Sequence, residues 1–356
     1  MEAEKVGKRY YNEAFGQDGE ARELYRPLLE ALEGLGPEEV AERHGRANAK
    51  LRELGATFNL PDEGDEPDGD RILPADWTPR LIPKDHWEGL SAGLLQRGRA
   101  INAWLADLHE GRGDAVPDEV IGSSAFYAQG GGPSFGTSLP CPVRVYGPDV
   151  VHLGGGEYVV LEDNARLPSG VAYSEAVRRA GLAAFPELFE PYRVYGMYEY
   201  YRALRSALEA AAAPGIEEPG LAVVSGGRDD PAFFEHERIA ATCGLKLLTL
   251  GELGLRGGEV FSRTDGSRVD VIYRRFDDGL LPNDLPELAE AYMRGRVDIV
   301  NSPGVGIADD KGVFPYVPAM IEHYLGEAPI LPNAPPSPSS TPNSGRRPWN
   351  ACRSSS

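Results

Sequence analysis

The chain has 356 residues, of which 41% are hydrophobic, and a formal net charge of −19. This length predicts about two domains, and the hydrophobic fraction is typical of a globular protein rather than a disordered one. The excess of acidic side chains argues against nucleic acid, whose phosphates require clustered Lys and Arg, and equally against an anionic membrane surface.

The N-terminal segment is charged and lacks the apolar stretch of a signal peptide, and no run of apolar residues is long enough to span a membrane. The three cysteines, Cys141, Cys243 and Cys352, have no CxxC spacing, so they predict neither a zinc site nor a disulfide framework. We therefore expect a cytoplasmic protein without a membrane or nucleic-acid partner.

Helical patterns dominate the first part of the chain. Residues 21–54 carry leucines at helical spacing, and residues 86–111 repeat the pattern and end near a glycine. Arg97 and Arg99 in the second pattern are expected to be surface charges. After a break, residues 172–212 return to a helical pattern.

The segments between these helices have loop compositions. Residues 61–70 hold six acids without the acid spacing of a calcium loop, so we expect an exposed loop. Residues 123–142 are rich in Gly and Pro, and we expect a loop that leads into a strand over 143–147.

An apolar hairpin follows. Residues 150–153 and 158–161 are rich in β-branched and aromatic residues, and three consecutive glycines supply the turn between them. With a four-residue loop over 154–157, Leu153 pairs with Tyr158. Counting outward from that pair predicts a second pair, two acids facing each other where the hairpin arms end.

Those two acids are Asp149 and Glu162, and Asn164 falls on the same face as Glu162 because side chains alternate along a strand. Carboxylates that face each other across a ladder repel unless something neutralises them. A magnesium ion would do so, because it prefers oxygen ligands from carboxylates and phosphates. The alternative is a solvated hairpin end without a ligand.

A strand–helix–strand pattern of Rossmann type occupies the next part of the chain. The strands are expected over 220–227, 245–250, 268–276 and 297–302, with a helix over 230–244. The glycine loop 303–311 then precedes a helix, a position where phosphates often bind. It matches neither the P-loop nor the GxGxxG spacing, so its nucleotide signal is weak by spacing alone.

The last 23 residues, 334–356, contain no acid and are rich in Ser and Pro. Such a composition cannot build a core, so we expect disorder. A functional tail and a shifted reading frame are both compatible with it, and the composition favours the shifted frame.

Several stretches, taken together, resemble the circularly permuted ATP-grasp family, type 2, which is related to glutathionylspermidine synthase. The matching stretches are "YYNEAFGQDG", "ILPADWTPRLIPKDHWEGLSAGLLQRGRAINAWLADLHEG", "VVLEDNARLPSGV", "VDVIYRRFDD" and "VNSPGVGIADDKGVFPYVPAMIEHYLGEAPILPN". They follow one another in the family's order from about residue 10 to Asn333. The EDNxRxPSG and GxGxADDK strings are the most specific of the set.

The resemblance implies an α/β (α+β) fold of circularly permuted ATP-grasp type, with a Rossmann-like α/β subdomain and an incomplete C-terminus. The implied division is 1–213 for the helical and metal-binding part, 214–333 for the α/β subdomain and 334–356 for the tail. The implied activity is ATP- and Mg²⁺-dependent ligation of a small or peptide-like carboxylate to an amine through an acyl phosphate. In the family's pattern the metal ligands fall on Asp149, Glu162 and Asn164.

Further site residues follow from the resemblance. Arg166 would face the transferred phosphate or the substrate carboxylate, since Arg clamps both in bidentate fashion; pairing with Asp163 or Glu162 is the alternative. Arg274 and Arg275 are adjacent on a strand, so at most one is expected to reach a ligand, and Arg274 is taken as the catalytic one, with Arg166. Residues expected in the same cleft are Lys311 as a catalytic group and Ser169, Gly170, Gly304, Gly306, Asp309 and Asp310 as cofactor-binding groups.

Two other classes of function remain open. One is a non-catalytic binding module that keeps the fold and uses its acidic cleft to hold a partner or a cation. The other is a dinucleotide enzyme built on residues 220–302, for which Glu252 is the one acid placed to hold a ribose. The ligase is favoured because it accounts for all the matching stretches.

The family usually continues beyond the LPN motif with a Val-Lys-Pro stretch and a glycine-rich lid, and here the Ser/Pro tail follows instead. We therefore expect the purified chain to release ADP from ATP very slowly or not at all. A coupled assay for ADP release tests this, and turnover at a normal enzymatic rate would contradict it. Translating the gene in all three frames from Leu331 onward shows whether another frame restores the missing stretch.

Overall fold

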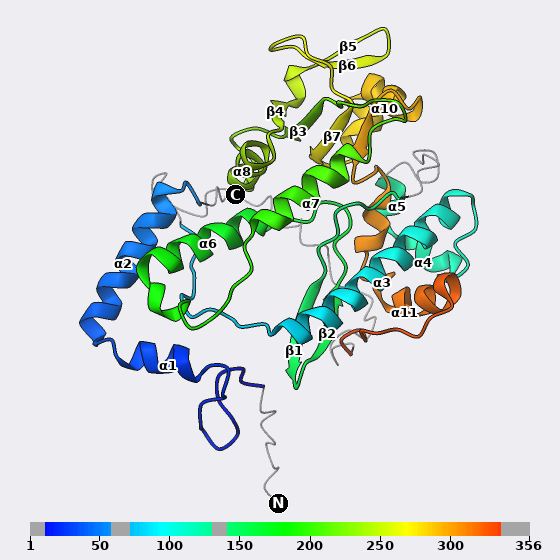
Figure 1. The fold of residues 1–356 in the computed structure, drawn as a ribbon. Coiled ribbons are helices and arrows are strands. Elements are labelled where there is room, and N and C mark those ends of the chain that lie inside the picture. Colours follow the sequence, from blue (N-terminus) through cyan, green and yellow to red (C-terminus); the bar gives the residue numbers. More distant parts are fainter. Residues whose placement is uncertain (1–10, 58–71, 130–140, 336–356) are drawn as a thin grey trace, which may run out of the picture.

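The computed structural model describes residues 11–57, 72–129 and 141–335, which form a mixed α/β fold (Figure 1). The acid-rich segment 61–70 and nearly all of the tail expected over 334–356 lie outside the described residues. No helix within the described part is both long enough and apolar enough to cross a membrane.

Helices form most of the N-terminal half, as the leucine spacing predicts. They are α1 (Arg26–Glu33), α2 (Pro37–Glu53), α3 (Lys84–His109), α4 (Asp118–Ser123) and α5 (Ala125–Gln129). α2 has proline at its first position, where the missing N–H leaves no backbone bond unmade. α5 is a correction to the loop predicted over 123–142.

The hairpin consists of β1 (Asp149–Gly154) and β2 (Glu157–Glu162). The predicted end pair, Asp149 opposite Glu162, is confirmed, but the predicted Leu153–Tyr158 pair is wrong because Tyr158 lies opposite His152. Gly155 and Gly156 form a two-residue turn in which both have positive φ, a turn that suits the twist of a hairpin. Two irregularities in the register, one near each end, cancel and restore the end pair.

The segment 141–148 that enters β1 contains no strand, so the strand predicted over 143–147 is wrong. Side-chain amides take the place of a neighbouring strand here. Asn102 of α3 accepts from the Val143 N–H at 2.8 Å and donates to its carbonyl at 3.0 Å. Asn301 accepts from the N–H groups of residues 144 and 145.

The helical pattern over 172–212 is two helices rather than one, α6 (Val171–Ala184) and α7 (Tyr198–Glu209). The break contains a short 3₁₀ helix, η2 (Pro186–Leu188), and a second proline, Pro191. Proline lacks the N–H that a continuous helix requires, so the chain turns at this point.

A four-stranded parallel sheet follows, with the order β4–β3–β7–β8. Its strands are β3 (Leu221–Ser225), β4 (Lys246–Thr249), β7 (Val271–Arg275) and β8 (Asp298–Val300). Successive residues of β3 face opposite layers: Val223 packs with α7 and α8 (Phe233–Cys243), and Val224 packs with α10 (Pro286–Met293). This alternation confirms the Rossmann-like strand–helix–strand unit.

Several further elements complete this half, among them the helix expected after the glycine loop. The hairpin of β5 (Leu253–Arg256) and β6 (Glu259–Ser262) turns at Gly257 and Gly258 and lies at the opposite end of the molecule from α1 (Figure 1). The short elements are η3 (Leu250–Glu252), α9 (Leu280–Asn283), η4 (Val305–Asp309), η5 (Phe314–Tyr316), α11 (Val317–Met320) and the π-helical turn η6 (Ile321–Leu325).

The chain then returns to the hairpin. Asn333 forms a parallel bridge with Val160 of β2: the Val160 N–H donates to the Pro332 carbonyl, and the Val160 carbonyl accepts the Ala334 N–H. On its inner face β2 packs against Leu90 of α3 and Leu331. The LPN motif therefore lies along β2.

The buried ion pair between Arg97 and Asp163 connects α3 to the residue directly after β2. Both side chains are fully buried, with Arg97 Nη2 2.6 Å and Nε 3.1 Å from the two carboxylate oxygens. Arg97 Nη1 also donates to Asn333 at 2.8 Å, and the Tyr146 hydroxyl donates to Asp163. The prediction that Arg97 is a surface charge is wrong; Arg99, whose side chain is 62% exposed, fits it.

Replacing Arg97 by Ala is expected to destabilise the fold strongly, because the Asp163 charge would remain buried without its partner. Breaking a buried pair in this way costs about 3–5 kcal/mol. Thermal unfolding followed by circular dichroism should show a melting temperature lower by several degrees. Arg99→Ala, two residues along the same helix and exposed, is the matched control, and an equal effect of the two substitutions would contradict the assignment.

Candidate functional site

Two acids and a lysine gather where the hairpin arms end. Asp149 and Glu162 are opposite each other across the two strands of the hairpin. Partial burial raises the pKa of Asp149, and the charge of Glu162 raises it further. Lys311 Nζ lies 3.5 Å from a Glu162 oxygen, and its side chain is 86% exposed. The structure thus brings together a predicted catalytic residue and two predicted metal ligands.

The third predicted metal ligand, Asn164, follows the end of β2 and is half-buried. The backbone carbonyl of Asn164 accepts the Gly147 N–H at 2.9 Å, and this bond connects Asn164 to the segment entering β1. Among the described residues, no group of three or more His, Cys, Asp or Glu side chains is placed to hold a metal ion. A cation at this position would therefore need the Asn164 oxygen or oxygens of a ligand in addition to the two carboxylates.

Asp309 holds the backbone of the loop that follows β2. One of its oxygens accepts the N–H groups of Ala165 at 2.5 Å and of Arg166 at 3.1 Å. Burial raises the pKa of Asp309 to about 6, although these two hydrogen bonds favour the charged form. Asp309 was predicted to bind the cofactor, and the structure shows its carboxylate engaged with the loop backbone.

Asn301, at the end of β8, was not predicted from the sequence. Its side chain accepts from the N–H groups of Arg144 and Val145 and donates to the carbonyls of Val145 and Ala165, all within 2.9 Å. The residue is 1% exposed. Asn301 therefore links the segment entering β1 to the loop leaving β2.

The turn Pro168–Gly170 is held by a buried pair from the α/β half. Arg275 donates to the Pro168 carbonyl at 2.8 Å and to the Ser169 hydroxyl at 2.7 Å. Glu235 of α8 accepts the N–H groups of Gly170 at 2.8 Å and Ala172 at 3.0 Å. Arg275 is 5% exposed and Glu235 is fully buried. Glu235 gave no sequence signal, because an acid near a helix start is common.

Arg274, predicted to be catalytic, is fully buried and points to the other side of β7. It donates to Asp278 at 2.6 Å and to the carbonyls of Phe276 and Asn301. Asp278 in turn accepts the Gly304 N–H at 3.0 Å. Arg274 therefore supports the glycine loop through Asp278.

Arg166 lies at the edge of the glycine loop. Its guanidinium pairs with Asp277 at 2.9 Å rather than with Asp163 or Glu162, and it stacks over Phe126 with 5.0 Å to the ring centroid. Its Nε atom is buried and has no hydrogen-bond partner among the described residues. A side chain at Gly306 would meet Arg166 at 2.9 Å, so this glycine permits the close approach.

The other predicted residues of the glycine loop have local structural contacts. Gly304 has a φ of +85°, which favours glycine. Asp310 accepts from the Ser124 hydroxyl at 2.5 Å and from the Gly312 N–H at 2.8 Å. These contacts explain the residue types at these positions without assigning a ligand to them.

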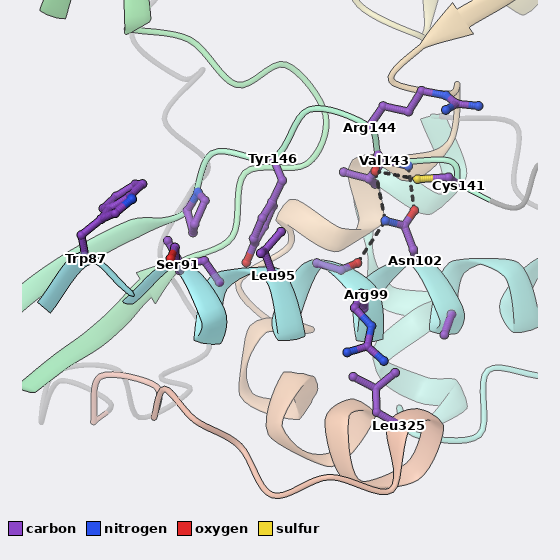
Figure 2. A pocket seen from close by; sticks show the side chains of 14 residues that line it. Trp87, Ser91, Leu95, Arg99, Asn102, Cys141, Val143, Arg144, Tyr146 and Leu325 are labelled. Carbon is purple, nitrogen blue, oxygen red and sulfur yellow. Dashed lines mark hydrogen bonds between the residues drawn. The ribbon is translucent and has the colours of Figure 1, made fainter. Parts of the chain in front are cut away.

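A pocket of about 730 Å³ lies between α3 and the segment 141–148. Figure 2 shows Trp87 and Arg99 on α3 and Tyr146 on the facing segment. The lining also includes Pro148, whose neighbour in the chain is Asp149. The pocket therefore ends next to Asp149, the first of the paired acids.

The parallel α/β sheet and the acid-bearing hairpin, joined through a polar loop, are the features to compare with known protein families. The description "circularly permuted ATP-grasp type 2" fits residues 79–344. The chain belongs to this family, which confirms the fold class expected from the sequence.

Relatives extend the comparison. An uncharacterized protein of Synechocystis sp. is 35% identical over 92% of this chain and 70% of its own length. A Frankia casuarinae protein named "Putative glutamate--cysteine ligase 2-2" is 38% identical over 91% of this chain, and a similarly named Frankia alni protein is 36% identical. The chain spans 39% of the length of each Frankia protein.

One solved structure shares the fold. The apo form of a glutathione synthetase-like effector from Globodera pallida has a TM-score of 0.54 and 13% sequence identity, covering 82% of this chain and 69% of that chain. At this identity the likeness concerns the fold alone.

Asp309→Ala is expected to destabilise the protein and to loosen the loop, because two backbone N–H groups would lose their acceptor. An unsatisfied buried donor costs about 1–3 kcal/mol. Asp309→Asn keeps one acceptor oxygen and should retain most of the stability. Thermal unfolding measures both, and hydrogen exchange at Ala165 and Arg166 should quicken in the Ala variant alone.

The pH dependence provides the control for this assignment. Since the pKa of Asp309 is about 6 in the folded protein and ordinarily 3.8, the folded state holds the extra proton between these values. The Asp309 contribution to stability therefore declines as pH rises from 4 to 6. The Asn variant should lack this part of the slope, and an unchanged slope would contradict the assignment.

Proposed function

We propose that this chain carries the metal-binding part of an ATP- and Mg²⁺-dependent carboxylate–amine ligase that acts through an acyl phosphate. Family membership supports the ligase class. The names of the two Frankia relatives support a small carboxylate, of the glutamate type, and an amine-bearing acceptor as the substrate class.

The observation that carries the proposal is the pairing of Asp149 with Glu162 where the hairpin arms end. Burial raises the pKa of Asp149 most, and the charge of Glu162 raises it further, because two carboxylates held opposite each other disfavour joint ionisation. A divalent cation would relieve the repulsion. The Asn164 oxygen would add a ligand without adding charge.

Asp149, Glu162 and Asn164 would hold the magnesium ion, which would supply positive charge beside the phosphate oxygens. Lys311 is exposed beside Glu162, so its ammonium group is free to reach a phosphate that enters the site. Arg166, whose guanidinium pairs with Asp277 at the edge of the glycine loop, would add a second positive group. Positive groups fixed in advance stabilise developing negative charge without reorganisation.

The loop between β2 and α6 contributes through its rigidity. Asp309, Asn301, Arg275 and Glu235 hold its backbone at five of the residues between 165 and 172. The side chains of Asn164 and Arg166 therefore start from a fixed backbone. Such preorganisation is what a site for phosphoryl transfer requires.

The test is magnesium binding by isothermal titration calorimetry on the purified full chain, a measurement that does not depend on turnover. We expect Glu162→Gln to weaken Mg²⁺ binding by at least about tenfold, because a charged ligand is lost. Asn164→Ala should weaken it by a smaller factor.

Glu157→Gln is the matched control. Glu157 lies on the same strand, is exposed, and stands at the other end of the hairpin opposite Gly154. Its substitution should leave the affinity unchanged. Equal Mg²⁺ affinity in the Glu162 and Glu157 variants would refute the proposed site.

A further inference from the structure

A second pocket, of about 250 Å³, lies among α6, α7 and α8, away from the hairpin. Its charged lining consists of one acid, Glu175, and three arginines, Arg178, Arg179 and Arg238. Three positive charges against one negative charge leave a local excess of two, within a chain whose net charge is −19. Such an excess in so acidic a protein needs an explanation.

Both oxygens of Glu175 already accept hydrogen bonds. Arg238 donates to both Glu175 oxygens, at 2.9 and 2.5 Å, and the Tyr201 hydroxyl donates at 2.7 Å. Arg179 approaches only to 3.8 Å. These contacts lower the pKa of Glu175 against the effect of its burial, so its charge persists and neutralises one guanidinium at most.

The remaining arginines keep donors for a ligand. A guanidinium carries five N–H donors in a planar fork. Among the described residues, Arg178 has one hydrogen bond, to the Tyr195 carbonyl at 2.6 Å, and Arg179 has the long contact to Glu175. The Arg179 side chain is 45% exposed, so its remaining donors are open to the pocket mouth.

An apolar wall stands beside these donors. Tyr198 is 65% exposed and Leu182 is 50% exposed, and Met197 completes this side of the pocket. Apolar side chains beside a few convergent polar groups are typical of a ligand site.

We propose that this pocket binds a small organic phosphate, with the organic part against Tyr198. The phosphate would lie on Arg178, on Arg179 and on the Nη1 donors of Arg238, which the bonds from its Nε and Nη2 to Glu175 leave unused. A phosphate has oxygens enough for three guanidinium groups, whereas a carboxylate has two. Guanidinium groups match phosphate geometry in bidentate fashion. The site shares no residue with the hairpin cluster, so the inference is independent of the proposed ligase activity.

The test uses inorganic phosphate and phenyl phosphate as probes, titrated calorimetrically into the full chain at fixed ionic strength. Both should bind saturably at millimolar concentration or below. Arg178→Gln and Arg179→Gln should each weaken binding by about tenfold, the usual effect of losing a charge-assisted hydrogen bond. Tyr198→Ala should weaken phenyl phosphate and leave inorganic phosphate unchanged.

Arg202→Gln is the control. Arg202 is exposed on α7, pairs with Glu199 at 3.2 Å and does not line the pocket. A second measurement needs no variant: phosphate should protect Arg178 and Arg179, more than Arg202, from modification by phenylglyoxal, as mapped by mass spectrometry.

Three results would overturn the proposal. One is the absence of saturable binding, and another is equal weakening by the Arg202 and Arg178 substitutions. The third is loss of phosphate binding in Glu162→Gln with binding retained in Arg178→Gln, which would place the anion at the hairpin cluster.

Discussion

The site depends above all on buried polar side chains that hold one loop. The loop leaves β2 at Asp163, whose charge is paired with Arg97 inside the core. Asn301 and Asp309 then bind the backbone at Ala165, and Arg275 binds the next turn. Buried polar groups cost free energy unless each finds a partner, so these bonds allow little alternative arrangement. These hydrogen bonds join the α/β sheet to the loop that follows the hairpin.

The acid pair is an outcome of this anchoring together with the geometry of the hairpin. Asp149 and Glu162 meet because two register irregularities cancel along β1 and β2. The segment entering β1 and the loop leaving β2 are both tied to Asn301, so the two ends of the hairpin cannot separate. Carboxylates that would repel in a free hairpin are thereby kept opposite each other, which is the arrangement a cation requires.

Patterns set by local periodicity were predictable, and contacts between distant residues were not. The strand–helix–strand pattern predicted the parallel sheet around Val223, and the glycine turn predicted the Asp149–Glu162 pair. The burial of Arg97 was missed, since helical spacing does not reveal a partner 66 residues away. Glu235 was missed for the same reason. The EDNxRxPSG string indicated the family but not which side chains hold its backbone.

The most direct measurement is anomalous diffraction from crystals soaked in Mn²⁺, which substitutes for Mg²⁺ at oxygen sites. The account predicts one strong peak within coordination distance of the Asp149 and Glu162 carboxylates and close to the Asn164 oxygen. A peak elsewhere, with none between these two acids, would contradict the claim that the hairpin is a metal site.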